Sequence, residues 1–153
     1  MCTLQRNRRT ASAFTLVELL IVIAIIAILA SLVLAAASSV QKKGARSRAE
    51  GEIAALEAAL ESFKADNGDY PTNSISNSSA SLVTNLMPTN GGKVYYEFKS
   101  KWLSGNNYLD PFGYSYNYIY TNGSPNNGTN NYDLWSTAGN SSDTNAKHWI
   151  KNW

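Results

Sequence analysis

The fold is decided by a run of apolar residues near the N-terminus, residues 13–37, which read AFTLVELLIVIAIIAILASLVLAAA. From Leu19 to Ala37 this run holds 19 residues without a charge. As an α-helix, a run of this length crosses a bilayer core of about 30 Å. A secretory signal peptide is the alternative, but the run is longer than a usual signal core, and a simple membrane anchor fits it better. The sequence therefore predicts one membrane-spanning helix.

The charged residues of the chain are divided by this run. The residues before Phe14 carry three arginines and no acid, a charge of +3, whereas the rest of the chain holds 10 basic and 11 acidic residues. With a net charge of only +2 overall, we expect no nucleic-acid partner. A second basic cluster follows the run, and we expect it to contact lipid headgroups or acids of an adjacent subunit, or to be only the solvated end of the helix. It consists of Lys42, Lys43, Arg46 and Arg48.

The single cysteine and the single histidine limit the possible chemistry. One cysteine excludes a disulfide framework within the chain, and one histidine, His148, excludes a multi-histidine metal centre. No nucleophile motif accompanies His148, so we expect no enzyme. The many tyrosines and tryptophans can form a carbohydrate-binding surface, although in a small β domain such rings are more often core.

Glu18 is the one carboxylate at the start of the apolar run. Such a group is costly in a membrane unless it is paired. A cut between Ala13 and Phe14 would create an α-amine close to Glu18. The amine and the carboxylate can neutralise one another, and we expect them to do so between neighbouring subunits.

Residues 13–20, AFTLVELL, resemble the prepilin processing signature of type IV pilins and type II secretion pseudopilins, with arginines before them and an apolar helix after them. In that family a membrane peptidase cuts before the Phe on the cytoplasmic side and methylates its new amine. The acid five residues in contributes to subunit recognition. The resemblance thus implies cleavage between Ala13 and Phe14, N-methylation of Phe14 and a role for Glu18 in assembly. The family usually has Gly where this chain has Ala13, so we expect slower processing.

A second helical pattern continues beyond the membrane run. Four apolar residues are spaced three, four and three apart, which places them on one helix face: Ile53, Leu56, Leu60 and Phe63. The acidic residues between them are expected on the wet side: Glu50, Glu52, Glu57 and Glu61. Gly68 offers a left-handed stop. One helix over residues 15–66 would be about 78 Å long.

From Pro71 onward, asparagine, glycine, serine and tyrosine dominate, which indicates turns that join short strands. The expected strands are residues 94–98, 114–120 and 132–135, and in the second of them the tyrosines 114, 116, 118 and 120 alternate on one face. Residues 73–81 are expected to be a mobile linker before a short segment at 82–86. Residues 121–131 are expected to form a hairpin-like loop.

The head contains further family strings: DPFG at residues 110–113, YDLWS at 132–136 and IKNW at 150–153. Their order resembles that of the major pseudopilins of type II secretion systems. The resemblance implies an α+β, type IV pilin-like fold in which a long N-terminal helix packs on a small antiparallel β-sheet head with long loops. The expected organisation is a leader at 1–13, a transmembrane and assembly helix at 14–40, an amphipathic spine at 41–66 and a head at 67–153.

Relatives in that group bind calcium in the loop before the terminal tryptophan. Carried over, the ligands would be Asn140 and Asp143. Calcium takes six to eight oxygens, and this loop offers only one carboxylate, with Lys147 beside it. The alternative is a loop held by asparagine hydrogen bonds and by packing of Trp149 and Trp153.

The resemblance implies a structural subunit of a secretion pseudopilus, processed by prepilin peptidase and assembled into a homo-oligomeric filament that drives protein export. Its partners would be the inner-membrane assembly platform and minor pseudopilins. We expect a single-pass protein of the bacterial inner membrane, with the leader cytoplasmic and the head periplasmic, that later joins a periplasmic pseudopilus. A type IV or competence pilin is the nearest alternative, and a membrane-anchored carbohydrate-binding domain is a more distant one.

Overall fold

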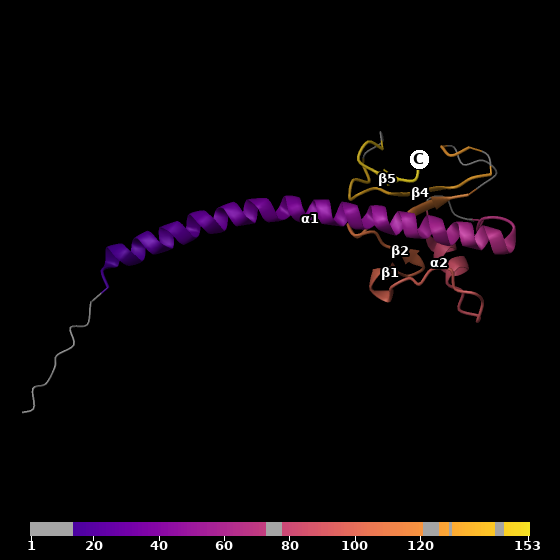
Figure 1. Ribbon diagram of the computed structural model, residues 1–153, viewed down its shortest axis with the longest axis horizontal. Coiled ribbons are helices and arrows are strands. Elements are labelled where there is room, and N and C mark those ends of the chain that lie inside the picture. Colours follow the sequence, from indigo (N-terminus) through magenta and orange to yellow (C-terminus); the bar gives the residue numbers. More distant parts are fainter. Residues whose placement is uncertain (1–13, 73–77, 121–125, 129, 143–145) are drawn as a thin grey trace, which may run out of the picture. The chain divides into compact units, whose positions relative to one another are not determined.

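A computed structural model describes residues 14–72, 78–120, 126–128, 130–142 and 146–153. The chain divides into two units between Val40 and Gln41. Figure 1 shows a long helix followed by short elements. In chain order these are α1 (Leu16–Asn67), α2 (Ala80–Leu86), a 3-10 helix (Ser100–Trp102), β1 (Leu103–Ser104), β2 (Asn107–Tyr108), β3 (Asn117–Ile119), β4 (Asp133–Ser136) and β5 (Ile150–Lys151).

The first unit contains the apolar part of α1. From Phe14 to Leu34 its leucine, isoleucine and valine side chains are exposed on every side of the helix. An isolated helix that is apolar all round belongs in lipid or among other helices, because water contact with this surface is unfavourable. Among the described residues, α1 is the one helix long and apolar enough to cross a membrane.

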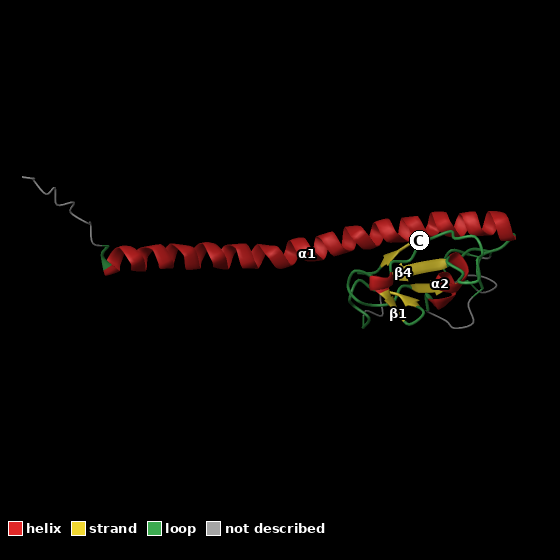
Figure 2. Ribbon diagram, turned by 90° about the horizontal axis from the view of Figure 1, so that it is seen from below, coloured by secondary structure: helices red, strands yellow, loops and turns green. Residues whose placement is uncertain are grey.

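In the second unit, the rest of α1 packs on the head through the predicted apolar stripe. Ile53, Leu56 and Leu60 are buried, Phe63 is partly buried, and Ala49 extends the stripe by one turn. Figure 2 shows the sheets and α2 on one side of this part of the helix. The stripe meets the aromatic and aliphatic residues of the head in one core. At about 1.5–3 kcal/mol for each large buried side chain, this contact stabilises both partners.

The predicted wet face of α1 is confirmed for Glu50 and Glu61, which are exposed, whereas Glu52 and Glu57 are partly buried. Glu52 is only 14% exposed and accepts a hydrogen bond from Tyr116 at 2.8 Å. Glu61 accepts one from the Tyr70 hydroxyl at 2.7 Å. These carboxylates are drawn toward the head because its buried tyrosine hydroxyls need acceptors.

The helix ends where the sequence predicted. Gly68 has φ +84°, a left-handed conformation, and its N–H donates to the Lys64 carbonyl at 2.7 Å. Glycine adopts this conformation without the steric cost of a Cβ. The bounds of α1 therefore agree with the predicted helix to one residue at each end.

The head contains two small antiparallel sheets. In one, β1 pairs with β2 across a tight turn in which Gly105 has φ +58°. In the other, β4 is central, with Tyr118 opposite Leu134 on one side and Ser136 opposite Ile150 on the other. The α+β fold expected from the sequence is confirmed.

Two predicted strands need correction. Residues 94–98 form no strand, because the N–H groups of Tyr95 and Tyr96 both bind the Leu86 carbonyl at the end of α2, at 2.8 and 3.2 Å. The strand predicted at 114–120 is reduced to β3. The N–H and carbonyl of Tyr114 both bond to Asp110 in a turn, so they are not available for pairing with a strand. The predicted 132–135 strand is β4, shifted by one residue.

The predicted mobile linker at 73–81 is wrong at its C-terminal end. Ser79 is fully buried, and its hydroxyl accepts the Tyr108 N–H at 2.8 Å and lies 3.3 Å from the Tyr108 carbonyl. This pair of contacts fixes the start of α2 against β2. Residues 73–77, like much of the loop predicted at 121–131, lie outside the described residues.

Candidate functional site

The start of α1 is closed by a reciprocal cap between Thr15 and Glu18. The Thr15 N–H and hydroxyl both donate to Glu18 Oε2, at 2.8 and 2.9 Å, and the Glu18 N–H donates to Thr15 Oγ1 at 3.2 Å. This is a capping box, in which two of the helix's unpaired N–H groups gain acceptors. The negative charge of Glu18 also complements the positive end of the helix dipole.

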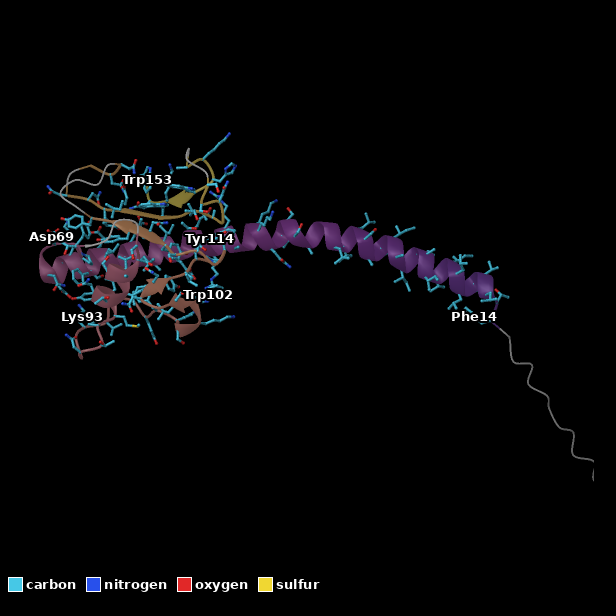
Figure 3. The ribbon with its side chains drawn as sticks, turned by 180° about the vertical axis from the view of Figure 1, so that it is seen from behind. Phe14, Asp69, Lys93, Trp102, Tyr114 and Trp153 are labelled. Atoms are coloured by element: carbon cyan, nitrogen blue, oxygen red, sulfur yellow. The ribbon has the colours of Figure 1, made fainter. Side chains whose placement is uncertain are left out.

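This cap uses only residues that follow the predicted cut. Phe14 precedes the helix and is 73% exposed. Figure 3 labels it at the N-terminal end of the drawn side chains. Ala13 lies outside the described residues. The spacing Thr-x-x-Glu was visible in the sequence as a capping signal, and our sequence reasoning missed it. Cleavage, methylation and the pairing of Glu18 remain predictions.

The DPFG and YDLWS strings meet at one buried carboxylate. Asp110 is fully buried, and its Oδ1 accepts the N–H groups of Phe112 and Tyr114, each at 2.9 Å. Its Oδ2 accepts the Ser136 hydroxyl at 2.5 Å, and Ser136 Oγ in turn accepts the Ala138 N–H at 2.9 Å. Asp110 thus fixes both its own turn and the start of the C-terminal loop, residues 137–149 between β4 and β5.

The terminal IKNW string completes the three-stranded sheet. The side-chain oxygen of Asn152 accepts the Leu134 N–H at 2.9 Å, and the backbone N–H of Asn152 donates to the Leu134 carbonyl at 3.2 Å. Trp135 stacks on Trp149 with ring centroids 5.8 Å apart and meets Trp153 edge to face at the same distance. These contacts show how both ends of the C-terminal loop are held.

Glu57 on α1 faces this end of the head. Burial raises its pKa above the usual range for glutamate, and the charge of Glu61 raises it further, while a hydrogen bond from Asn152 acts in the opposite direction. The Glu57 carboxylate is thus less favourable in the folded chain than in water.

A polar chain joins the head to α1 near the basic cluster. Arg48 binds Glu52 through two nitrogens, both at 2.8 Å, and its guanidinium lies 4.1 Å from the centroid of the Trp102 ring. The Tyr116 hydroxyl donates to the other oxygen of Glu52. Burial raises the pKa of Tyr116, and the hydrogen bond to Glu52 adds to this, so the phenol stays neutral.

The C-terminal loop borders a cavity of about 490 Å³. Lys42 and Arg46 of α1 line it on one side, and Asn140 and His148 of the loop line the other. Arg46 donates to the His148 carbonyl at 3.0 Å, so the helix and the loop are joined directly. The aromatic rings of Phe112 and Tyr114 complete the wall.

The predicted calcium ligands fit this cavity poorly. Asn140 lines it together with two cationic side chains, and no carboxylate is among its described lining residues. Within the described ranges no three histidine, cysteine, aspartate or glutamate side chains lie close enough to hold a metal. Asp143 lies outside the described residues, so calcium binding through Asn140 and Asp143 stays a prediction.

Comparison with known proteins gives two family matches that divide the chain. The prokaryotic N-terminal methylation motif matches residues 8–34, and Type II secretion system (T2SS), protein G, matches residues 37–153. The second match alone covers the spine of α1 and the whole head.

Curated relatives agree with these matches. The Type II secretion system core protein G of Pseudomonas aeruginosa is 35% identical over 117 residues, 74% of this chain and 76% of that protein. The protein of the same name from Vibrio cholerae is 34% identical over 69% of this chain and 75% of its own length. The Aeromonas hydrophila protein is 45% identical, but the match spans about half of its length, 46%. The chain therefore belongs to the type II secretion system protein G family.

Proposed function

We propose that the chain is a structural subunit of a type II secretion pseudopilus, anchored in the membrane by the first part of α1 and assembled into a filament through it. The observation that carries this is an apolar helix exposed on every side, capped at its start, on a chain with the head of the protein G family. The family consists of structural pseudopilins rather than enzymes.

Filament assembly would exchange lipid contacts of the apolar helices for contacts with one another. Van der Waals packing drives such association, since lipid and helix surfaces are similarly apolar. Both bonds from Thr15 go to Oε2 of Glu18, which leaves Oε1 to accept the methylated Phe14 amine of a neighbouring subunit. Each subunit would thus keep its own cap while its carboxylate sets the register to the next.

The cellular setting follows from the same proposal. Prepilin peptidase would remove residues 1–13 and methylate Phe14, with the basic leader on the cytoplasmic side. The subunit would reside in the inner membrane with its head in the periplasm until the assembly platform and minor pseudopilins add it to the filament.

The alternatives have less support. The head matches the type II secretion system protein G family over residues 37–153, and this match favours a secretion pseudopilin over a type IV or competence pilin. A carbohydrate-binding surface would need exposed rings, whereas five of the nine tyrosines are buried in the core: Tyr70, Tyr108, Tyr116, Tyr118 and Tyr132.

Substitution of Glu18 separates its two roles. Glu18→Gln keeps the capping box, because a glutamine at this position also accepts and returns the hydrogen bonds, but it removes the charge. Glu18→Ala removes both and costs the helix about 1 kcal/mol of capping. If Glu18 pairs with the Phe14 amine, both variants insert into the membrane and neither forms filaments.

Filaments are scored by shearing and electron microscopy, insertion by resistance to alkaline extraction, and processing by the intact mass of the subunit. We expect a mature mass that begins at methylated Phe14 in the parent and in both variants. Normal filaments from Glu18→Gln would show that Glu18 acts only as a cap. An unprocessed chain would instead contradict the proposed function itself.

A further inference from the structure

The cavity between α1 and the C-terminal loop is lined by positive charge, and the filament subunit proposed above does not account for it. Two cations enter it from the same face of α1, because Lys42 and Arg46 are four residues apart. No described lining residue is acidic. A volume of about 490 Å³ is within the range of about 300–1,000 Å³ that small ligands occupy.

The two cations still have donors to offer. Lys42 is exposed and makes no hydrogen bond or ion pair with the described part of the chain. Arg46 contacts Glu50 through Nε at 3.2 Å and the His148 carbonyl through Nη1 at 3.0 Å. A guanidinium has five N–H donors, so these contacts leave part of its fork open to a second acceptor. The charge of Glu50 offsets that of Arg46 in part, whereas no described carboxylate forms an ion pair with Lys42.

The place of the cavity along the chain indicates what the acceptor is. A bilayer core of about 30 Å takes about 20 helical residues, and counted from Leu19 it ends near residue 38. The headgroup layer adds about 5–8 Å on each side. Lys42 comes four residues after residue 38, which is about 6 Å along a helix, and so falls within this layer. Arg46 follows one helical turn after Lys42 along α1, and side chains of a helix incline toward its N-terminal end.

The aromatic wall fits the same position. Tyr114 is 44% exposed, and its backbone is fixed by the two contacts with Asp110. Tyrosines are enriched at membrane surfaces, where the ring lies against the acyl boundary and the hydroxyl reaches water. Its ring can therefore cover the glycerol region of a lipid whose phosphate binds the cations.

We propose that this cavity binds the phosphate of an anionic phospholipid in the leaflet beside the head. The inference rests on the membrane anchoring in the proposed function. Lys42 supplies a point charge, and Arg46 supplies a planar fork while holding the loop through the His148 carbonyl. A subunit with this lipid bound is positioned at a fixed depth before it enters a filament.

The test uses the full chain in a mild non-ionic detergent, titrated with phosphatidylglycerol and measured by native mass spectrometry. Lys42→Gln removes one cation that makes no hydrogen bond or ion pair with the described residues, so the fold is expected to be unchanged. The matched control is Lys43→Gln, with the same change of charge one residue along and about 100° around the helix, outside the cavity lining.

We expect the affinity for phosphatidylglycerol to fall about fivefold in Lys42→Gln. In Lys43→Gln the affinity should change by less than about twofold. Equal weakening by both variants would overturn the proposal, because it would show a diffuse attraction of the whole basic cluster. Displacement of the lipid by millimolar inorganic phosphate would overturn it in favour of a free-phosphate site. Unchanged lipid binding in Lys42→Gln, together with cross-linking of Lys42 to an acid of a second copy in filaments, would assign the cavity to subunit contacts. Release of the parent chain from membranes by alkaline extraction, measured separately, would instead contradict the membrane anchoring.

Discussion

Replacing Asp110 tests whether one carboxylate joins the DPFG turn to the C-terminal loop. Asp110→Ala would leave three donors without their acceptor: the N–H groups of Phe112 and Tyr114 and the hydroxyl of Ser136. An unsatisfied buried donor costs about 1–3 kcal/mol. The lower value for each of the three donors gives a loss of about 3 kcal/mol.

Asp110→Asn is the matched control. The amide oxygen still accepts the two backbone N–H groups, and only the bond from the Ser136 hydroxyl is lost, at about 1 kcal/mol. Both variants are unfolded in urea at constant detergent, and tryptophan fluorescence is followed because Trp135 adjoins Ser136. With a urea dependence of about 1.5 kcal/mol per molar, the midpoint falls by about 2 M for Ala and by less than about 1 M for Asn.

Equal losses in the two variants would refute this reasoning, because they would make the charge of Asp110, not its acceptor geometry, the source of stability. A shift of less than about 0.5 M in Asp110→Ala would show that the turn and the loop stand without it.

Two further measurements concern Glu57 and calcium. Because the pKa of Glu57 is raised, the folded chain loses stability as pH rises through that pKa, so Glu57→Gln should be more stable than the parent at pH 7. The gain should vanish below about pH 4, where the glutamate is protonated in both states, and a gain independent of pH would contradict a role for the charge. The calcium site predicted at Asn140 and Asp143 is tested by the unfolding midpoint, which does not change with calcium if the cationic lining described for the cavity excludes the ion. A rise with calcium that is reversed by EDTA and lost in Asn140→Ala and Asp143→Ala would instead establish the metal site.

The parts of the fold that sequence predicted well are those set by local pattern. The bounds of α1 follow from an apolar run, a stripe of period 3.6 and Gly68, all of which act within a few residues of where they stand. The Thr15–Glu18 cap belongs to the same class and was readable, though it was overlooked.

The parts that were missed depend on partners far away in the chain. The strands β1, β2 and β5 have two residues each and exist only because another segment pairs with them. The 94–98 segment has strong strand propensity, but the N–H groups of Tyr95 and Tyr96 donate to the Leu86 carbonyl instead of to a neighbouring strand. Likewise, nothing local indicates that Glu52 will turn to a tyrosine 64 residues later.

The even apolar surface of the first part of α1 has a mechanical consequence. Between Leu16 and Ala37 the one hydroxyl is that of Ser31, which donates to the Ile28 carbonyl of its own helix at 2.7 Å and so makes no side of the helix polar. Rotating the helix about its axis therefore exchanges one apolar side chain for another at little cost in free energy. Glu18, in the first turn of α1, is then the one charged group of the apolar part whose position depends on how the helix is rotated. Lipid therefore sets no preferred rotation of this helix, and only packing against neighbouring helices can fix which of its sides faces them.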